Sequence, residues 1–506
     1  MSKALTVGTP WKVMVLFAIP LLIGNVVQQM YQVADAMVVG QHLGVNALAA
    51  VGSTGSMLFL LIGFAQGMTQ GFSIPLAQAF GAGDADGVRR SVAAGTILTA
   101  ISSLILMVSA PLFARPFLAL LQTPPELLDD ATQFAVINFL GVGAIMFFNY
   151  LSAIIRAIGD SRTPLVFLTI ACLINVALVV LFVQFLDFGV AGAALATVIA
   201  QLISVIACLI YLMRSIPVLH TRKSDWKVNR ALLGKHLHIG LPMGFQMSIV
   251  AIGTLAVQVR LNMLGTNAVA AFTTAMRVDG LAVFCLASLG LAVATFVAQN
   301  YGAGQMERIR VGVRQAIIIS IGISVVMSFT LITFGEPILQ MFVGDDAQIV
   351  VDMAHEYLVI NGMLYVLLGV LFITRNALQG LGRTLAPTIS GLLELGMRVT
   401  AAIVLGDLFG YTGVVWGTPL AWIAAICLLV PSWMMAKKSL NQNDDGAAAS
   451  IDTAEPGPVA NVDTNVAEVG QTGVADAVVA ETDTATTTEQ GRSSETGTFP
   501  VTVVAS

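Results

Sequence analysis

The sequence has 506 residues, of which 57% are hydrophobic and only 10% are charged, and its mean hydropathy is +0.86. A soluble globular protein carries about 25% charged residues, so this composition excludes that class and indicates an integral membrane protein. The net charge of −5 comes from the C-terminal tail, because the residues from Asn441 onward hold eleven acids and one base, and the rest of the chain has a net charge of +5.

Twelve apolar runs are each long enough to cross a bilayer as a helix, which takes about 20 apolar residues. In chain order they cover residues 13–34, 46–71, 89–111, 131–154, 164–186, 189–212, 237–262, 268–297, 311–333, 350–374, 386–406 and 413–435. We therefore predict an all-α integral membrane protein with twelve transmembrane helices.

The basic residues are concentrated on one side of these spans, which carries nineteen of the 24. By the positive-inside rule we predict a multi-pass protein of the cell inner (plasma) membrane with both termini in the cytoplasm. The longest basic loop, "RSIPVLHTRKSDWKVNRALLGK", follows the sixth span. We predict an N-terminal lobe over 1–215, a cytoplasmic linker over 216–236, a C-terminal lobe over 237–440 and a disordered acidic tail over 441–506, which has few large apolar side chains.

The two halves of the chain match each other at a constant offset. "HLGVNALAAV" (42–51) matches "MLGTNAVAAF" (263–272), and "AQAFGAGDADGVRRSV" (77–92) matches "AQNYGAGQMERIRVGV" (298–313), both at the same displacement along the chain. Because each half has six spans, an even number, both halves insert in the same orientation. We expect two six-helix bundles related by a pseudo-two-fold axis along the membrane normal, an architecture typical of transporters with a binding site between or within the lobes.

The most conspicuous polar group of the first span is Asp35, in "NVVQQMYQVADAMVVG". An ionised aspartate at the bilayer centre costs on the order of 2.5–3.5 kcal/mol, so it is expected to face water, a cation or a hydrogen-bond partner. Because burial disfavours the charged form, Asp35 could switch between charged and neutral forms, as a coupling residue must. The alternative is that Asp35 only caps the span at the outer interface, since "GQHLG" follows closely.

Further polar residues of the first span lie on the Asp35 side of the helix. Gln28 and Gln32 share a face with Asn25 and Asp35 at spacings of three to four residues. We take this stripe as a candidate lining of a wet cavity, with hydrogen bonding between helices as the alternative.

Charged residues also occur in spans of the second half. Arg277 and Asp279, in "TTAMRVDG", are two residues apart and so do not pair directly. A buried structural network and a substrate- or proton-linked role both stay open for them. Glu394 and Arg398 are four apart and should form a pair within one helix. Glu394 is also a candidate residue of a substrate cavity.

Several functional classes lack their usual signals. The four cysteines form no Cys-x-x-Cys pair, and the five histidines show no metal-ligand spacing such as His-Glu-x-x-His. The turn "GAGDADG" has no preceding strand and no GxGxxG spacing, and there is no Walker motif. We therefore expect no enzyme, no catalytic residues, no cofactor apart from a coupling ion, and no nucleic-acid partner.

With twelve spans and an internal repeat, the chain resembles the multidrug and toxic compound extrusion (MATE) family of prokaryotic antiporters from Trp11 to Lys438. The motifs that carry the resemblance are, in order, "FAIPLLIGNVVQQMYQVADAMVVGQHLG", "ALAAVG", "AQAFGAGD", "RAIGDSRTP", "GVAGAALAT", "AMRVDGLAVF" and "VAQNYGAG". The resemblance implies two six-helix bundles that open alternately to either side of the membrane. It also implies export of organic cations and other amphiphiles, driven by inward flow of sodium ions or protons.

The resemblance further implies a cation site within the N-terminal lobe. An acid on the first helix matches Asp35, an asparagine on the fifth matches Asn175, and a threonine on the sixth matches Thr197. Many members have an aspartate one turn after the asparagine, where this chain has Val179. Sodium prefers several oxygen ligands, so this departure leaves open whether Asp35, Asn175 and Thr197 hold sodium or Asp35 only takes a proton. The acids that some members carry on the seventh and tenth helices are absent from "MSIVAIG" and "VLLGVLF".

The sequence thus predicts a secondary multidrug efflux antiporter, acting as a monomer in the lipid bilayer on small organic cations or amphiphilic drugs. The alternative is a flippase for a lipid-linked saccharide, which shares the wider superfamily's architecture. A flippase should line its cavity with several basic residues to hold a pyrophosphate. The membrane-embedded bases here reduce to Arg260, Arg277 and Arg398, which argues against that function.

Overall fold

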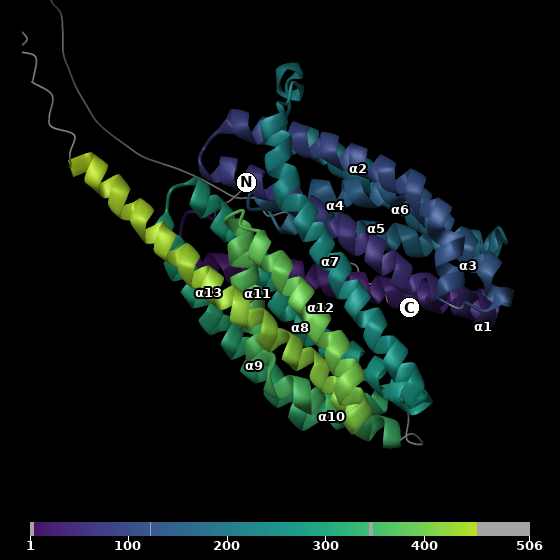
Figure 1. Ribbon diagram of the computed structural model, residues 1–506. Helices are drawn as coiled ribbons and strands as arrows, with labels where there is room; N and C mark the ends of the chain where they lie inside the picture. Colours follow the sequence, from purple (N-terminus) through teal and green to yellow (C-terminus); the bar gives the residue numbers. More distant parts are fainter. Residues whose placement is uncertain (1–4, 122, 344–347, 453–506) are drawn as a thin grey trace, which may run out of the picture. The chain divides into compact units, whose positions relative to one another are not determined.

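The computed structural model describes residues 5–121, 123–343 and 348–452, and this part of the chain is helical without a strand. The first half forms α1 (Pro10–Gly81), α2 (Ala85–Leu120), α3 (Pro125–Leu140), α4 (Val142–Ala157), α5 (Arg162–Val180), the π-helical turn η1 (Leu181–Phe185) and α6 (Gly189–Ser215). The second half forms α7 (Arg230–Leu264), α8 (Thr266–Gly302), α9 (Met306–Val343), α10 (Gln348–Met363), α11 (Tyr365–Gly380), α12 (Leu385–Phe409) and α13 (Tyr411–Asp452). In Figure 1, α2 to α6 form one group of helices, α8 to α13 form another, and α7 runs between them.

The predicted count of twelve transmembrane helices is confirmed for the described residues. Ten helical segments are long and apolar enough to span a bilayer by themselves. Two further spans are broken, because α3 and α4 meet at 46° and α10 and α11 meet at 55°. These bent pairs are the fourth span of each half, so the internal repeat extends to the positions where helices break.

A glycine in the left-handed region ends the first span of each half. Gly44 interrupts α1 with a φ of 85°, and Gly265 separates α7 from α8 with a φ of 100°. This backbone conformation disfavours residues with a Cβ, which explains why glycine occupies both positions. The two glycines occupy equivalent positions of the sequence repeat, within "HLGVNALAAV" and "MLGTNAVAAF".

The segment that joins the two halves is more structured than a flexible linker. The predicted linker over 216–236 holds two 3₁₀ turns, Pro217–Leu219 and Lys223–Trp226, followed by the start of α7. α7 begins at Arg230 because the Asn229 side chain caps it, accepting a hydrogen bond from the Leu232 N–H. At the far end of the chain, α13 runs to Asp452 and includes the first residues of the predicted disordered tail over 441–506. Residues 453–506 lie outside the described part.

Each lobe has its own hydrophobic core of fully buried large side chains. Phe72 and Phe139 lie in the core of the first lobe, and Phe296 and Tyr365 lie in that of the second. Met14, near the start of α1, is buried in the core of the second lobe. The first turns of α1 therefore join the two lobes at one end of the molecule.

At this end the lobes are held together by a symmetric pair of hydrogen bonds. The Gln78 side-chain amide of α1 donates to the Gly380 carbonyl of α11 at 3.2 Å. The Gln299 side-chain amide of α8 donates to the Ala157 carbonyl of α4 at 2.7 Å. The two glutamines are equivalent in the sequence repeat, and each crosses to the other lobe. We call this pair of bonds the glutamine latch. We call the end of the molecule where these four residues lie the basic end, because Arg89 and Arg308 follow near the starts of α2 and α9, and Arg383 lies in the turn before α12.

The backbones are also in direct contact at the latch. A Cβ on Gly81 would collide with the Gln299 carbonyl group, and a Cβ on Gly302 would collide with the Gln78 carbonyl group. Glycine is needed at both positions for this close approach. The basic end is therefore closed in this structure, and the candidate site lies further along the helices.

Candidate functional site

Asp35 is half-buried on α1, and one of its carboxylate oxygens is fully buried. Among the described residues, Asp35 Oδ1 has no hydrogen-bond partner. A buried polar atom without a partner is costly, and its presence in a native fold points to a ligand, an ion or a proton that binds there. Asp35 is thus a candidate for binding a proton, an ion or a ligand, as its place in an apolar span suggests.

Asn175 and Thr197, which the family resemblance places in one cation site with Asp35, are in contact. The Asn175 Nδ2 amide of α5 donates to Thr197 Oγ1 of α6 at 3.1 Å, and Thr197 donates to the Ala193 carbonyl at 3.2 Å. The Tyr31 hydroxyl of α1 lies 3.3 Å from Thr197 Oγ1. Residues of α1, α5 and α6 therefore meet at Thr197. Tyr31 is one helical turn before Asp35 on α1.

The remaining buried acceptors of this region lie close to Thr197. Asn175 Oδ1 and Gln201 Oε1 are buried without a partner among the described residues, like Asp35 Oδ1. Gln201 is one turn from Thr197 on α6, and Asn175 bonds to Thr197 directly. At this site α1, α5 and α6 therefore each carry one buried oxygen atom without a partner among the described residues.

Val179 lies in a closed apolar cluster beside this site. It is fully buried with Val39 of α1 and Ala193 of α6, each one helical turn from Asp35, Asn175 or Thr197. The part of α1 before Gly44 and the helix α5 both run away from the basic end, so Val39 and Val179 lie at one depth, and Asp35 and Asn175 lie at the next. The position of the missing second carboxylate is filled by packing, which leaves Asp35 as the single acid at this site among the described residues.

The site lies beyond the last hydrogen bond that joins the two lobes. The Asn25 Nδ2 amide of α1 donates to Ser288 Oγ of α8 at 3.1 Å. Of the interlobe hydrogen bonds among the described residues, this one is furthest from the basic end. Asp35 is ten residues further along α1, or about 15 Å at the rise of an α-helix. The carboxylate is therefore at the side of the molecule where the lobes are not bonded to each other.

The candidate cavity residues fall into two groups, of which the first faces the space between the lobes. Gln28 is half-buried, Gln32 is exposed, and neither has a hydrogen-bond partner among the described residues. Arg277 of α8 is exposed and likewise has no partner in the described part of the chain. It is eleven residues, or about three turns, from Ser288, so both side chains leave the same face of α8, at a depth near that of Asp35.

The second group, Asp279 and Glu394, is buried in the second lobe rather than exposed to a cavity. Asp279 accepts hydrogen bonds from the Tyr365 hydroxyl and, at 3.4 Å, from the Tyr357 hydroxyl. These tyrosines lie on either side of the bend between α10 and α11. A carboxylate in an apolar core needs such partners, so Asp279 connects α8 to the broken span.

Glu394 is held by two arginines. Arg375 of α11 donates to Glu394 Oε1, and Arg398 lies 3.8 Å from Glu394 Oε2, as the four-residue spacing predicts. Glu394 is only 3% exposed, so its charge is compensated inside the lobe. Arg375 lies on a different helix from Glu394 and could not have been identified as its partner from helical spacing.

Tyr31 and Gln201 were not among the predicted site residues. Both occupy positions one helical turn from a predicted residue, Tyr31 before Asp35 and Gln201 after Thr197. Helical periodicity applied to each predicted residue would have found them.

The described residues contain no group of three or more His, Cys, Asp or Glu side chains that could hold a metal ion.

The chain is similar to known proteins in both of its halves. Residues 20–181 and 242–404, one segment in each lobe, match the MatE family model. The chain is 30% identical over 432 residues to the probable multidrug resistance protein YoeA of Bacillus subtilis (strain 168), covering 83% of this chain and 92% of that protein. It is 24% identical over 424 residues to the multidrug export protein MepA of Staphylococcus aureus (strain N315), covering 83% and 92%.

Its fold is also similar to that of a MOP superfamily transporter from Pyrococcus furiosus, with a TM-score of 0.79, 24% identity, and 86% and 97% of the two chains covered. The twelve spans, the repeat and the matches in both lobes lead to one assignment: the chain belongs to the MatE family, that is, the MATE transporters.

Proposed function

We propose that this protein is a secondary active multidrug efflux antiporter, which exports organic cations or amphiphilic xenobiotics in exchange for protons or sodium ions by alternating access. The Bacillus relative is named a probable multidrug resistance protein and the Staphylococcus relative a multidrug export protein, which supports multidrug efflux. The observation that carries the proposal is the buried Asp35 carboxylate oxygen without a partner among the described residues, one helical turn from Tyr31, which contacts Thr197.

Exchange follows from competition for one carboxylate. A charged Asp35 attracts an organic cation, whereas a neutralised Asp35 does not, so binding of the coupling ion favours release of the substrate. Because the two ligands exclude each other, the gradient of one drives transport of the other. The Tyr31 hydroxyl, one helical turn from Asp35 on α1, contacts Thr197 of α6.

The donor set favours a proton as the coupling ion. Sodium, a hard cation, prefers several oxygen ligands, including carboxylates. The site offers one carboxylate, and Val179 fills the place of a second with apolar packing. A single carboxylate suffices for a proton. Sodium coupling is the alternative, with the Asn175 and Thr197 oxygens as additional ligands.

The glutamine latch supports a transport cycle with two end states. In this structure the lobes are bonded at the basic end and free of mutual hydrogen bonds at the depth of Asp35, among the described residues. The positive-inside rule assigns the basic end to the cytoplasm, so this is the outward-facing state. The inward-facing state requires that both latch bonds break.

The flippase alternative is disfavoured by the arginines. Arg260 forms an ion pair with Asp407, and Arg398 lies beside Glu394. Of the three bases deepest in the predicted spans, only Arg277 is left without a partner among the described residues. One cation does not provide the multiple contacts that a pyrophosphate group needs.

The chain is a multi-pass membrane protein of a transporter family. We propose that it lies in the inner (plasma) membrane with both termini in the cytoplasm. We propose that it acts as a monomer, since both sides of the path come from one chain. Labelling of a single cysteine placed at Lys438 with an impermeant reagent should occur only in inside-out vesicles.

The function is tested with Asp35→Asn in inside-out membrane vesicles, where transport of a fluorescent cation is driven by an imposed pH gradient or by an imposed sodium gradient. We expect Asp35→Asn to abolish transport at normal expression. The control Asp129→Asn, at an exposed aspartate paired with Arg115, should transport like the unmodified protein. Unchanged transport by Asp35→Asn would refute the coupling role, and the gradient that energises the unmodified protein identifies the ion.

A further inference from the structure

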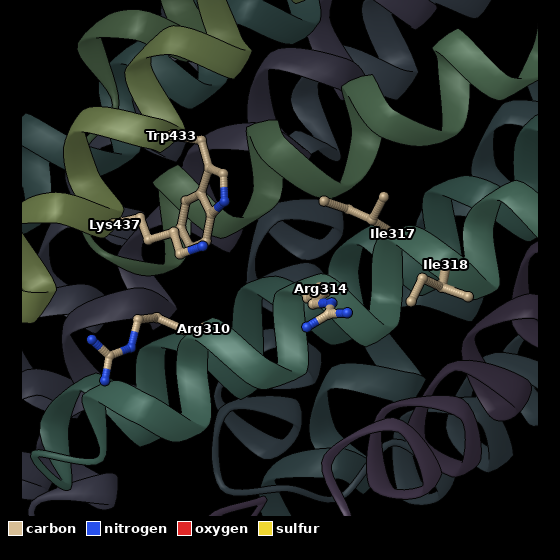
Figure 2. Close-up of a pocket in the computed structure, with 6 residues that line it drawn as sticks. All are labelled: Arg310, Arg314, Ile317, Ile318, Trp433 and Lys437. Carbon is tan, nitrogen blue, oxygen red and sulfur yellow. The ribbon is translucent and has the colours of Figure 1, made fainter.

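The basic end of the second lobe contains a small cavity between α9 and α13. It has a volume of about 240 Å³ and is lined by two groups, the cations Arg310, Arg314 and Lys437 and the apolar residues Ile317, Ile318 and Trp433. Figure 2 shows Trp433 and Lys437 on one helix facing Arg310 and Arg314 on the other. The transport site described above uses none of these residues.

Among the described residues, the lining carries positive charge without an acid. Arg314 and Lys437 are exposed and have no ion pair in the part of the chain that the structure describes. Arg310 donates a hydrogen bond to Asn441 Oδ1, which holds its guanidinium toward α13. Arginine is well suited to phosphate because its planar donors can bind two oxygens at once. The cavity therefore has the charge and donors of a site for a phosphate group.

The lining residues are also ordered along the helix axes. Arg310 and Arg314 occupy two successive turns of α9 near its start, and Ile317 and Ile318 follow on the next turn. On α13, which runs the other way, Trp433 comes one turn before Lys437. The cations thus lie toward the basic end, and the apolar side chains lie toward the middle of the predicted spans.

This order matches the parts of a phospholipid. The predicted spans 311–333 and 413–435 begin and end at this depth, so the cavity lies where the bilayer meets water. Tryptophan is enriched at that interface. Basic pockets between transmembrane helices on the cytoplasmic side bind anionic headgroups. A free phosphate would use the cations but would leave the isoleucine side chains without a partner.

We propose that this cavity binds an anionic phospholipid of the cytoplasmic leaflet, with the headgroup phosphate on Arg314 and Lys437, beside Arg310, and the first acyl carbons on Ile317 and Ile318. Such a lipid bridges α9 and α13 and stabilises the second lobe. The proposal does not depend on which substrate or coupling ion the transporter uses.

The test uses the full chain purified in detergent, with thermal unfolding followed during titration with phosphatidylglycerol, phosphatidylcholine or inorganic phosphate. We expect phosphatidylglycerol alone to raise Tm. In Arg314→Gln/Lys437→Gln, half of the rise should need about 25-fold more phosphatidylglycerol, because each basic residue near an anionic membrane surface changes binding about fivefold.

The matched control is Arg214→Gln/Lys438→Gln, which removes two exposed charges from the same end of the molecule outside the cavity. This control should bind phosphatidylglycerol like the unmodified protein. Equal weakening in both double variants would overturn the proposal in favour of unspecific surface charge. A Tm rise of the same size with inorganic phosphate would overturn the assignment of a lipid.

Discussion

Removal of either side-chain amide of the glutamine latch is expected to shift the transporter toward the state that is open at the basic end. Gln78→Ala removes the bond to the Gly380 carbonyl, and Gln299→Ala removes the bond to the Ala157 carbonyl. Gln299 also accepts a hydrogen bond from the Leu5 N–H through Oε1 at 2.7 Å. Gln299→Ala should therefore have the larger effect of the two.

The size of the shift follows from burial. Gln78 is 9% exposed and Gln299 is fully buried, so each substitution leaves a buried carbonyl unpaired in the closed state only. Such a loss amounts to about 1–3 kcal/mol. A change of this size alters the ratio of two conformations about 5- to 150-fold. Because the two backbones are in contact at the latch, the double variant measures the coupling between the two bonds.

The populations can be measured from the distance between spin labels on the two lobes at the end opposite the latch. Gln41 and Met263 are both exposed near Gly44 and Gly265, and the labels would be attached to cysteines there, in a chain whose four native cysteines are replaced. The latch variants should increase the population with the shorter distance. Gly81→Ala should act in the same direction, because its Cβ would collide with the Gln299 carbonyl group.

Gln305→Ala is the matched control, since this glutamine is exposed at the same end and outside the latch. It should leave the distance distribution unchanged. If both latch variants gave the distribution of the control, the two hydrogen bonds would not contribute to closure, and the assignment of this structure as one of two exchanging states would fail.

Two further predictions concern the carboxylates. Glu394→Ala should destabilise the second lobe by about 3–5 kcal/mol, because it leaves Arg375 as a buried charge without its carboxylate; a Tm in detergent equal to that of the unmodified protein would contradict this. Val179→Asp places a second acid one turn from Asn175 and should make transport respond to an imposed sodium gradient, whereas Val179→Asn should not; a sodium response of equal size in both variants would show that the carboxylate is not responsible.

The sequence predicts a large part of the fold because the relevant signals are local. Apolar runs of sufficient length define twelve spans, and the constant offset of the repeat relates Gly44 to Gly265 and Gln78 to Gln299. The same local reading misplaces the ends of elements. α7 starts at Arg230 because Asn229 caps it, and the fourth span of each half is bent, which the hydropathy of a continuous apolar run does not reveal.

The candidate site is predicted in part for the same reason. Asp35 stands out in an apolar run, and Tyr31 and Gln201 could have been found by helical spacing. The partners of charged groups in the second lobe could not be found in this way. Asp279 and Glu394 have the sequence appearance of cavity residues, but Tyr365 and Arg375 compensate them from another helix.

The sequence by itself determined that the chain is a twelve-span membrane protein built from two related halves, with an acid in the first span of the first half. Hydropathy and helix periodicity suffice for this, because both depend on neighbouring residues. Only the tertiary structure decided which polar groups are satisfied and which are not. Asp279 accepts hydrogen bonds from tyrosines of a distant span, whereas Asp35 keeps a buried oxygen without a partner among the described residues. That difference depends on which helices pack together, and it makes Asp35 a stronger candidate for the coupling residue than Asp279.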